Sequence, residues 1–295
     1  MSTEEKIRAA ALLVSFTMQV GMAQPALTVK SLLPDEPGVY LLPPSSPRFA
    51  QAVATDFEYV RDLAALHPYS VVLVNDTEKD IIAYSLRWIA RDPDGKAIRR
   101  EESNCSFSSG MLSEEPALGS RSAHVLIPVG DLIIAGPGPW NPAKTKALND
   151  QLAFLERFRD TTVTLDSVVF DDGSAVGQDP KGWIPRWKAL LDAGRDLAGV
   201  VGRTADPDVR SELEEMRRPG LSLAQAKRTA LGSMMYSAST YEEAYIAARA
   251  YLANNQLAFM QLGGEFSDLE RLREVIKQKR FPIIHRSDNS KENLK

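Results

Sequence analysis

The sequence has almost no cysteine and no long apolar segment. Cys105 is the only cysteine in 295 residues, so no disulfide can form within the chain and packing must hold the fold, unless Cys105 pairs with another chain. Beyond the first 23 residues, no stretch approaches the roughly 18 apolar residues of a membrane-spanning helix, so we expect no transmembrane helix. The net charge of −4 disfavours nucleic acid as a main partner.

Recognisable catalytic and cofactor motifs are missing as well. The histidines His67, His124 and His285 are never at the spacing of metal ligands, and we expect each to be a surface residue or one whose hydrogen bonds are satisfied. Gly136-Pro-Gly-Pro139 is rich in glycine, but its prolines remove the backbone N–H donors that a phosphate loop needs. Cys105 has no activating base beside it in the sequence, which predicts a buried or inert thiol. The sequence therefore identifies no catalytic residue, no cofactor and no metal site.

Residues 1–23 are typical of a cleaved secretory signal. Two basic residues precede an apolar run, Ala9 to Ala23, that is too short to span a bilayer and ends in small residues. We therefore expect a mature chain that begins near Gln24 and works in the periplasm or outside the cell. The alternative is an ordinary buried helix of a cytosolic protein, which Glu4 and Glu5 favour because they cancel the two positive charges.

Residues 24–67 are rich in proline and predict an extended arm and linker with one edge strand near Gly38–Leu41. From residue 68 to residue 178, apolar side chains recur at every second position, which predicts short strands. The clearest strand runs from Ile81 to Arg91, and its apolar face is formed by Ile82, Tyr84, Leu86, Trp88 and Ala90. Such a series is typical of an antiparallel, immunoglobulin-like β-sandwich, in which Trp88 fills the space between the two sheets.

Two segments depart from the strand pattern. Residues 141–159 include a stretch, Ala143 to Phe158, whose composition predicts one short helix in a crossover between strands. Residues 48–66 are compatible with either a short helix or a loop.

The apolar period changes to 3.6 after residue 179, which predicts a helical unit over residues 179–286. Acidic residues outnumber basic ones before this boundary, and the reverse holds after it. The helix-start signals are Asp206-Pro207, Ser222, Thr240 and Ser267. The pattern leaves open whether the helices form their own bundle, wrap onto the sandwich or form a seam between copies. Residues 287–295 are polar and predict a disordered tail.

Residues 70–200 resemble a group of uncharacterised exported proteins from soil bacteria. The resemblance is carried by the strand–turn–proline rhythm of residues 70–128 and by Val163 to Asp179, where a strand, Phe170-Asp-Asp-Gly173, a short strand and Val176-Gly-Gln-Asp179 precede helices. It implies an exported immunoglobulin-like β-sandwich followed by helices. It implies no known function and transfers no catalytic residue.

Two kinds of side chain remain as candidate binding residues. Five aromatic residues at helical spacing form either a groove for a sugar or peptide or, as is commoner for such stripes, part of a core: Trp183, Trp187, Tyr241, Tyr245 and Tyr251. Five loop carboxylates carry the hard oxygen atoms that suit Ca²⁺ or an acid pair of a glycosidase: Asp92, Asp94, Asp171, Asp172 and Asp179. No glutamate closes an EF-hand loop around them, and an Asp-Gly turn already has a structural reason in positive φ.

The sequence therefore predicts an exported α+β protein, with an immunoglobulin-like β-sandwich followed by a C-terminal helical unit. We expect a non-enzymatic protein that binds another protein, a ligand or an envelope component through the sandwich. The alternative is a hydrolase whose acidic catalytic residues are scattered along the chain. A concave pocket that gathers Asp, Glu or His from both units favours the hydrolase, and an exposed apolar patch favours the binding protein.

Overall fold

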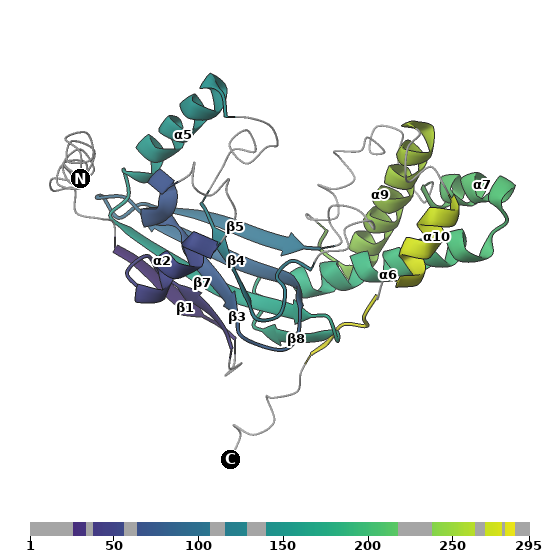
Figure 1. The fold of residues 1–295 in the computed structure, drawn as a ribbon, viewed down its shortest axis with the longest axis horizontal. Helices are drawn as coiled ribbons and strands as arrows, with labels where there is room; N and C mark the ends of the chain where they lie inside the picture. The colour runs from purple at the N-terminus through teal and green to yellow at the C-terminus, as the bar shows by residue number, and fades with distance from the viewer. Residues whose placement is uncertain are drawn as a thin grey trace, which may run out of the picture.

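The computed structural model describes residues 26–33, 38–55, 64–106, 116–128, 140–217, 238–262, 269–278 and 281–286. Sheets and helices are both present, which confirms the α+β class. The sheets are formed mainly by the first two thirds of the chain, and a group of helices extends from one end of them (Figure 1). The expected signal, the expected tail and the helix starts at Ser222 and Ser267 lie outside the described residues. Within the described ranges, every helix is too short or too polar to cross a membrane.

The β part consists of two sheets. The larger sheet has the strand order β5-β4-β7-β8-β9, and β1 pairs with the first half of β7 along the edge that β8 uses for the second half. Its strands are β1 (Ala26–Ser31), β4 (Ile81–Arg91), β5 (Ala97–Cys105), β7 (Asp160–Phe170), β8 (Ser174–Gly177) and β9 (His285–Arg286). The smaller sheet has the order β2-β3-β6, with β2 (Val39–Leu42), β3 (Val71–Asn75) and β6 (Ser122–Leu126).

The expectation of an entirely antiparallel sandwich is wrong for the larger sheet. β1 runs parallel to β7, and β9 runs parallel to β8. Both additional strands come from segments outside the predicted strand series, one from the proline-rich stretch before it and one from the end of the chain. Alternation along a single strand does not reveal the direction of its partner, so the sequence pattern missed these pairs.

The two sheets pack face to face around a shared apolar core. Tyr84, Leu86 and Trp88 of β4 meet Val71 and Leu73 of β3 in this core. The Trp88 side chain is 4% exposed and lies between the sheets, as its place on a central strand predicts. Its indole N–H donates a hydrogen bond to the Glu102 carboxylate of β5 (3.2 Å).

One residue of β4 faces the opposite side from the predicted one. Strict alternation places Ile82 with Tyr84, but Ile82 packs on the outer face of the larger sheet and Ile81 enters the core between the sheets. The register between β4 and β7 shifts between Ile81 and Ala83. An irregularity of this kind changes which side chains face each side of the sheet.

Short helices cover the sandwich where the sequence pattern was ambiguous. α2 (Pro47–Thr55) packs Phe49 onto the outer face of the smaller sheet, and a 3₁₀ helix occupies Ala64–Tyr69. Residues 48–66 are therefore helical at both described ends. The helix predicted between two strands is α5 (Pro142–Leu155), which lies in the connection from β6 to β7.

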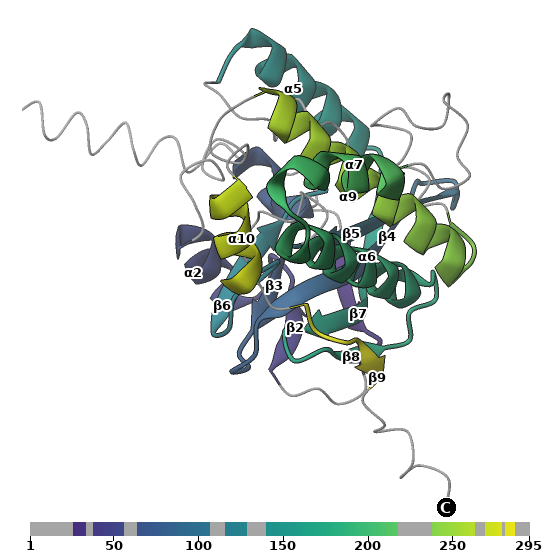
Figure 2. The ribbon, with the colours of Figure 1, turned by 90° about the vertical axis from the view of Figure 1, so that its right-hand side faces the viewer.

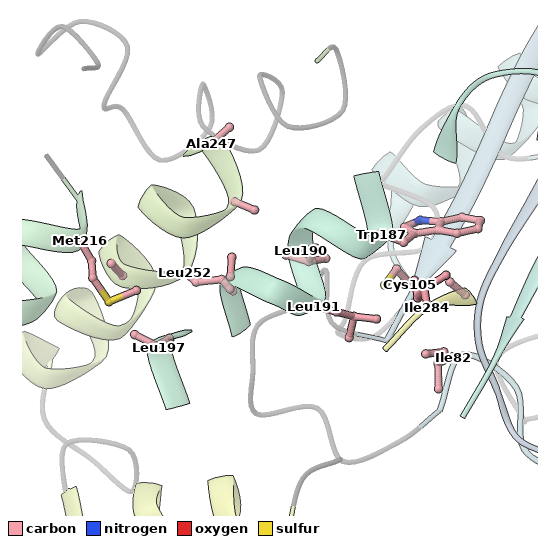
Figure 3. Packing of buried hydrophobic residues seen from close by; sticks show 14 of the residues in the cluster. Ile82, Cys105, Trp187, Leu190, Leu191, Leu197, Met216, Ala247, Leu252 and Ile284 are labelled. Atoms are coloured by element: carbon pink, nitrogen blue, oxygen red, sulfur yellow. The ribbon is translucent and has the colours of Figure 1, made fainter. Parts of the chain in front are cut away.

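The C-terminal helices share one apolar core with the outer face of the larger sheet. They are α6 (Trp183–Arg203), α7 (Asp206–Arg217), α9 (Tyr241–Leu262) and α10 (Leu269–Gln278). The first half of α6 packs Trp187 and Leu191 near Ile82 and Cys105 of the sheet (Figure 3). Farther along, its Leu197 joins the core formed with α7 and α9. Seen from the helical end, α6, α7 and α9 lie in front of the sheets (Figure 2), so α6 serves both the sandwich and the helical group.

Replacing Trp88 by alanine tests the core between the sheets. We expect Trp88→Ala to lower the free energy of unfolding by about 3–5 kcal/mol, because it leaves a large cavity and removes the donor to Glu102. Urea unfolding measures the change. Trp140→Ala is the matched control, because Trp140 is 38% exposed, and it should cost less than about 1 kcal/mol. Equal losses in the two variants would contradict the assignment.

Candidate functional site

Three connections between strands meet at one end of the sandwich, which we call the loop end. They are residues 76–80 between β3 and β4, residues 116–121 before β6, and residues 171–173 between β7 and β8. Asp80 joins all three. Its carboxylate accepts a hydrogen bond from the Ser120 N–H (2.7 Å), and its carbonyl oxygen accepts one from the Asp171 N–H (2.9 Å). The three connections therefore hold one another in place.

Asn75, at the end of β3, is fully buried and fixes the loop end with its side-chain amide. The amide nitrogen donates to the carbonyl oxygens of Lys79 (2.8 Å) and Gly119 (2.9 Å). The amide oxygen accepts from the N–H (3.2 Å) and the hydroxyl (2.6 Å) of Thr77. Both donors and both lone pairs are used, and a buried network satisfied in this way makes its surroundings rigid.

Asp172 ties the β7–β8 hairpin to the β3–β4 connection. Its carboxylate accepts hydrogen bonds from the N–H (2.8 Å) and hydroxyl (2.5 Å) of Ser174, and it lies 2.8 Å from the Lys79 Nζ. Burial alone would raise the pKa of Asp172, but the bonds from Lys79 and Ser174 outweigh it and lower the pKa to about 2. Gly173 follows with a φ of +86°, as the Asp-Gly pair predicts.

A pocket of about 480 Å³ opens at the loop end, between α2 and the smaller sheet. Its less exposed lining, the floor, is aliphatic and consists of Leu42, Ala52, Val74 and Ala123. Its more exposed lining, the rim, is polar and consists of Arg48, Gln51, Asp76, Arg121 and Ser122. A pocket of this size suits a small molecule or a short segment of a larger one.

Tyr40 links the two charged groups on one side of the rim. Its hydroxyl donates a hydrogen bond to the Asp76 carboxylate (2.6 Å) and accepts one from the Arg48 guanidinium. The guanidinium also lies 3.7 Å from Asp76 and over the Tyr40 ring. Burial, together with the hydrogen bond to Asp76, raises the pKa of Tyr40, so the phenol stays protonated and keeps donating.

Arg121 lies on the other side of the rim, and its backbone has a positive φ. Its φ is +53°, in the left-handed region that side chains rarely adopt, and its N–H donates to the Thr77 carbonyl oxygen (3.2 Å). Its guanidinium donates two hydrogen bonds to one carboxylate oxygen of Glu78. Backbone strain of this kind is concentrated at functional sites, which makes the rim a candidate site.

The pocket presents charged and hydrogen-bonding groups above an aliphatic floor. The rim presents two guanidinium groups, one carboxylate, an amide and a hydroxyl, and its described lining includes no Cys or His that would serve as a nucleophile or base. In the part of the chain that the structure describes, no group of His, Cys, Asp and Glu side chains is arranged to hold a metal ion. The pocket is therefore suited to recognition by charge and hydrogen bonding.

The other loop carboxylates predicted as candidates serve local structure. Asp92 accepts hydrogen bonds from the N–H groups of Asp94 (3.1 Å) and Lys96 (2.8 Å) in the β4–β5 turn, at the opposite end of the sandwich. Asp179 caps α6 through the N–H groups of Trp183 (2.6 Å) and Ile184 (2.9 Å). The five predicted carboxylates therefore lie in three separate places, and only Asp171 and Asp172 belong to the loop end.

The aromatic stripes are divided between core and surface contacts. Trp183 stacks on Trp187, whose side chain is buried in the core, and Tyr241 stacks on Tyr245 in α9. The Tyr241 hydroxyl donates to the Asp192 carboxylate of α6 (2.5 Å), and the Tyr245 hydroxyl donates to Asp196. Tyr251 packs against the same core. These contacts give each ring a structural role in holding α6 to its neighbours.

The histidines and the cysteine do not come together. His67 lies in the 3₁₀ helix with its ring 6.3 Å from Phe49, His124 lies on β6, and His285 lies on β9. Cys105 is buried, in the core between the larger sheet and the helices. The structure therefore confirms that this thiol is buried.

A second polar cluster lies along β5, the strand at one end of the larger sheet, and near β6. Arg100, Glu102 and Asn104 alternate along β5 and share the face of Trp88, Leu86 and Tyr84, their partners in register on β4. Burial raises the pKa of Glu102, although the Trp88 indole, Arg100 and His124 act in the opposite direction. This cluster places a carboxyl group with a raised pKa near an imidazole.

The residues of the pocket were not predicted from the sequence. Arg48, Asp76 and Arg121 come from three segments far apart in the chain, and no spacing rule joins them. Residues 75–80 read as a polar turn, and the Asn-Asp-Thr sequence at its start indicates a turn but not its contact with residue 119. One available signal was Arg121 directly after Gly-Ser in a turn, a position where a left-handed residue is common.

Replacing Asp172 by asparagine tests the rigidity of the loop end. Because the pKa of Asp172 in the folded protein is below its usual value of 3.8, its stabilisation is present above that value and is lost as the pH falls towards 2. We expect Asp172→Asn to lower the free energy of unfolding by about 1 kcal/mol at pH 7, since Lys79 and Asp172 are each nearly half exposed. The loss should shrink at pH 2.5. Urea unfolding at both pH values, with the exposed Asp94→Asn as control, measures it; an equal loss at both values would contradict this role.

Comparison with known proteins gives no relative from which a function can be carried over. No family model, no curated protein and no solved structure matches the chain. The resemblance of residues 70–200 to exported proteins therefore stays a prediction.

Proposed function

We propose that this protein is exported and acts as a non-enzymatic binding module, whose β-sandwich recognises its ligand or partner through the loop end. The observation that carries the proposal is a charged pocket to which two hydrogen-bonded connections contribute Asp76 and Arg121. The Asn75 amide and the Asp80 carboxylate fix these connections without any ligand. A site that is ordered in advance loses less conformational entropy on binding.

The strand order supports an immunoglobulin-like sandwich. In such domains one sheet contains strands A, B and E, and the other contains C′, C, F and G. The order β2-β3-β6 fits A-B-E, and the order β5-β4-β7-β8 fits C′-C-F-G. Trp88 on β4 then corresponds to the buried tryptophan on strand C. On this assignment, β1 and β9 are additions to the common scheme.

The same assignment supports recognition at the loop end. Residues 76–80 become the B–C connection and residues 171–173 become the F–G connection. These are two of the connections with which immunoglobulin variable domains bind their targets. A shared fold does not by itself imply a shared function, and the pocket at the loop end is independent support for recognition there.

The expected location narrows the class of partner. Residues 1–23 have the pattern of an export signal, and the resemblance of residues 70–200 is to exported proteins. An exported binding module meets envelope components and molecules that enter the envelope. The helical group supports the sandwich from the far face of the larger sheet, away from the core between the sheets.

One observation favours the alternative of a hydrolase. The Glu102 carboxyl lies on β5, and burial raises its pKa, as burial does for the carboxyl of a general acid. His124 is near enough to oppose this shift, so the cluster contains a carboxyl group and an imidazole. The cluster takes its residues from the sandwich alone, whereas the predicted hydrolase site gathers residues from both units.

Photo-crosslinking tests the binding proposal. A photoreactive amino acid at position 51 replaces Gln51, an exposed lining residue of the pocket, and the control carries it at position 94 in the turn at the opposite end. In cells that produce the protein, we expect one dominant adduct from position 51 and none of that species from position 94. Absence of an adduct at position 51, or the same adduct from both positions, would remove the loop end as the recognition surface.

Glu102→Gln tests the alternative. A raised pKa means that ionisation of Glu102 opposes folding, so stability from this group is present at low pH and is lost as the pH rises through its pKa. We expect Glu102→Gln to raise the melting temperature at pH 7 and to have less effect at pH 4. The result checks the raised pKa on which the hydrolase alternative depends. A melting temperature that is unchanged or lower at pH 7 would contradict it.

A further inference from the structure

The two arginines of the pocket rim are held by exposed carboxylates that an incoming group can replace. The Arg48 and Asp76 side chains are 59% and 44% exposed, and the Arg121 and Glu78 side chains are 63% and 79% exposed. Ion pairs with this much solvent contact contribute little to stability, so their exchange for an equivalent partner is inexpensive. The Arg121 guanidinium already donates hydrogen bonds to the Glu78 carboxylate, so a carboxylate is a group that it binds.

The floor of the pocket limits the rest of the ligand. The aliphatic side chains of Leu42, Ala52, Val74 and Ala123 provide a small apolar surface below the charged rim. The described lining contains no aromatic ring on which a sugar or a nucleobase would stack. A short aliphatic group matches this floor in size and polarity.

The charge balance of the rim favours one negative charge over two. Arg48 and Arg121 are offset by Asp76 and Glu78, so the four groups sum to zero. A monoanion can replace Glu78 at Arg121 while Asp76 stays on Arg48. A dianion such as phosphate would bring a second charge close to both carboxylates, which repel it.

We infer that the pocket binds a monocarboxylate that carries a short aliphatic group, with Arg121 gripping the carboxylate and the floor covering the aliphatic part. The inference rests on the proposed function, because it names the ligand class of the same site. The chemistry is shared by a free small carboxylic acid and by the C-terminal residue of a peptide. Planar guanidinium groups bind carboxylates through paired hydrogen bonds, which gives this contact its direction.

Titration of the full chain with matched ligands tests the inference. The probe is N-acetyl-L-alanine, the neutral control is N-acetyl-L-alaninamide, and inorganic phosphate tests for a general anion site. We expect calorimetry or NMR to show the carboxylate binding at least about tenfold more tightly than the amide, because a charge-assisted hydrogen bond is lost in the amide. Binding of a short alanine peptide through its free C-terminus, at an affinity above that of N-acetyl-L-alanine, identifies a peptide as the source.

Three variants separate this role from folding. Arg121→Gly removes the guanidinium and also relieves the positive φ, so it should weaken binding by about tenfold or more without lowering the melting temperature. Glu78→Gln removes the competing carboxylate and should tighten binding by up to about fivefold. Arg210→Gln, at an exposed position on α7, is the matched control and should leave binding unchanged.

Each outcome decides for or against the carboxylate. Selective binding of N-acetyl-L-alanine with the predicted effects of the variants supports it. Equal binding of the amide, preferential binding of phosphate, or no binding of any probe overturns it. If position 51 still gives its adduct when the carboxylate fails to bind, the proposed function stands and only the ligand class is wrong.

Discussion

Burial of β7 on both faces is the constraint on which the rest of the structure depends. Val163, Leu165, Val168 and Phe170 face the smaller sheet, while Val169 faces the helices, and each is fully buried. One strand therefore lies in two apolar cores at once. Its two edges are also occupied, by β4 on one side and by β1 and β8 on the other, so every backbone group along most of the strand has a partner within the sheet. The sandwich and the helical group are coupled because they share this strand.

A register shift in the same strand, at Asp166, lies beside the segment in which β8 ends and α6 begins. The register between β4 and β7 shifts after Ser85, so no residue of β4 lies opposite Asp166. Its buried carboxylate is bound by two nitrogens of Arg87 (2.6 and 2.7 Å), and its carbonyl oxygen accepts from the Gln178 N–H (3.1 Å). A Cβ at Gly177 would lie 2.1 Å from that carbonyl oxygen, so only glycine lets β8 approach. β8 ends there, and Asp179 caps α6 two residues later.

The sequence predicted what depends on local period and missed what depends on register and contact between distant segments. The strand at Ile81–Arg91, the helix at Trp183 and the place of Trp88 follow from apolar spacing, because burial on one face imposes that spacing on the chain. The side assigned to Ile82 was wrong because the register shift at Ala83 leaves no mark in composition. The parallel pairing of β1 was missed because its strand lies in a proline-rich stretch that reads as a linker. The pocket was missed because its residues are distant in the sequence. Arg48, on α2, and Arg121, just before β6, are 73 positions apart and line the same pocket.

The two ends of the sandwich differ in a way that bears on function. At the end opposite the loop end, the β4–β5 turn is closed by its own backbone hydrogen bonds and by the Asp92 carboxylate, and its residues are mostly exposed. At the loop end, the buried Asn75 amide joins the β3–β4 connection to the connection before β6, and the rim above it keeps charged groups in solvent. A turn that only had to reverse the chain would not need a buried amide with every hydrogen-bonding position used, nor an arginine at a φ of +53° where glycine would fold with less strain. A rigid base beneath exchangeable surface charges is the arrangement expected of a recognition site, since the base fixes the direction of each guanidinium while its partner remains replaceable.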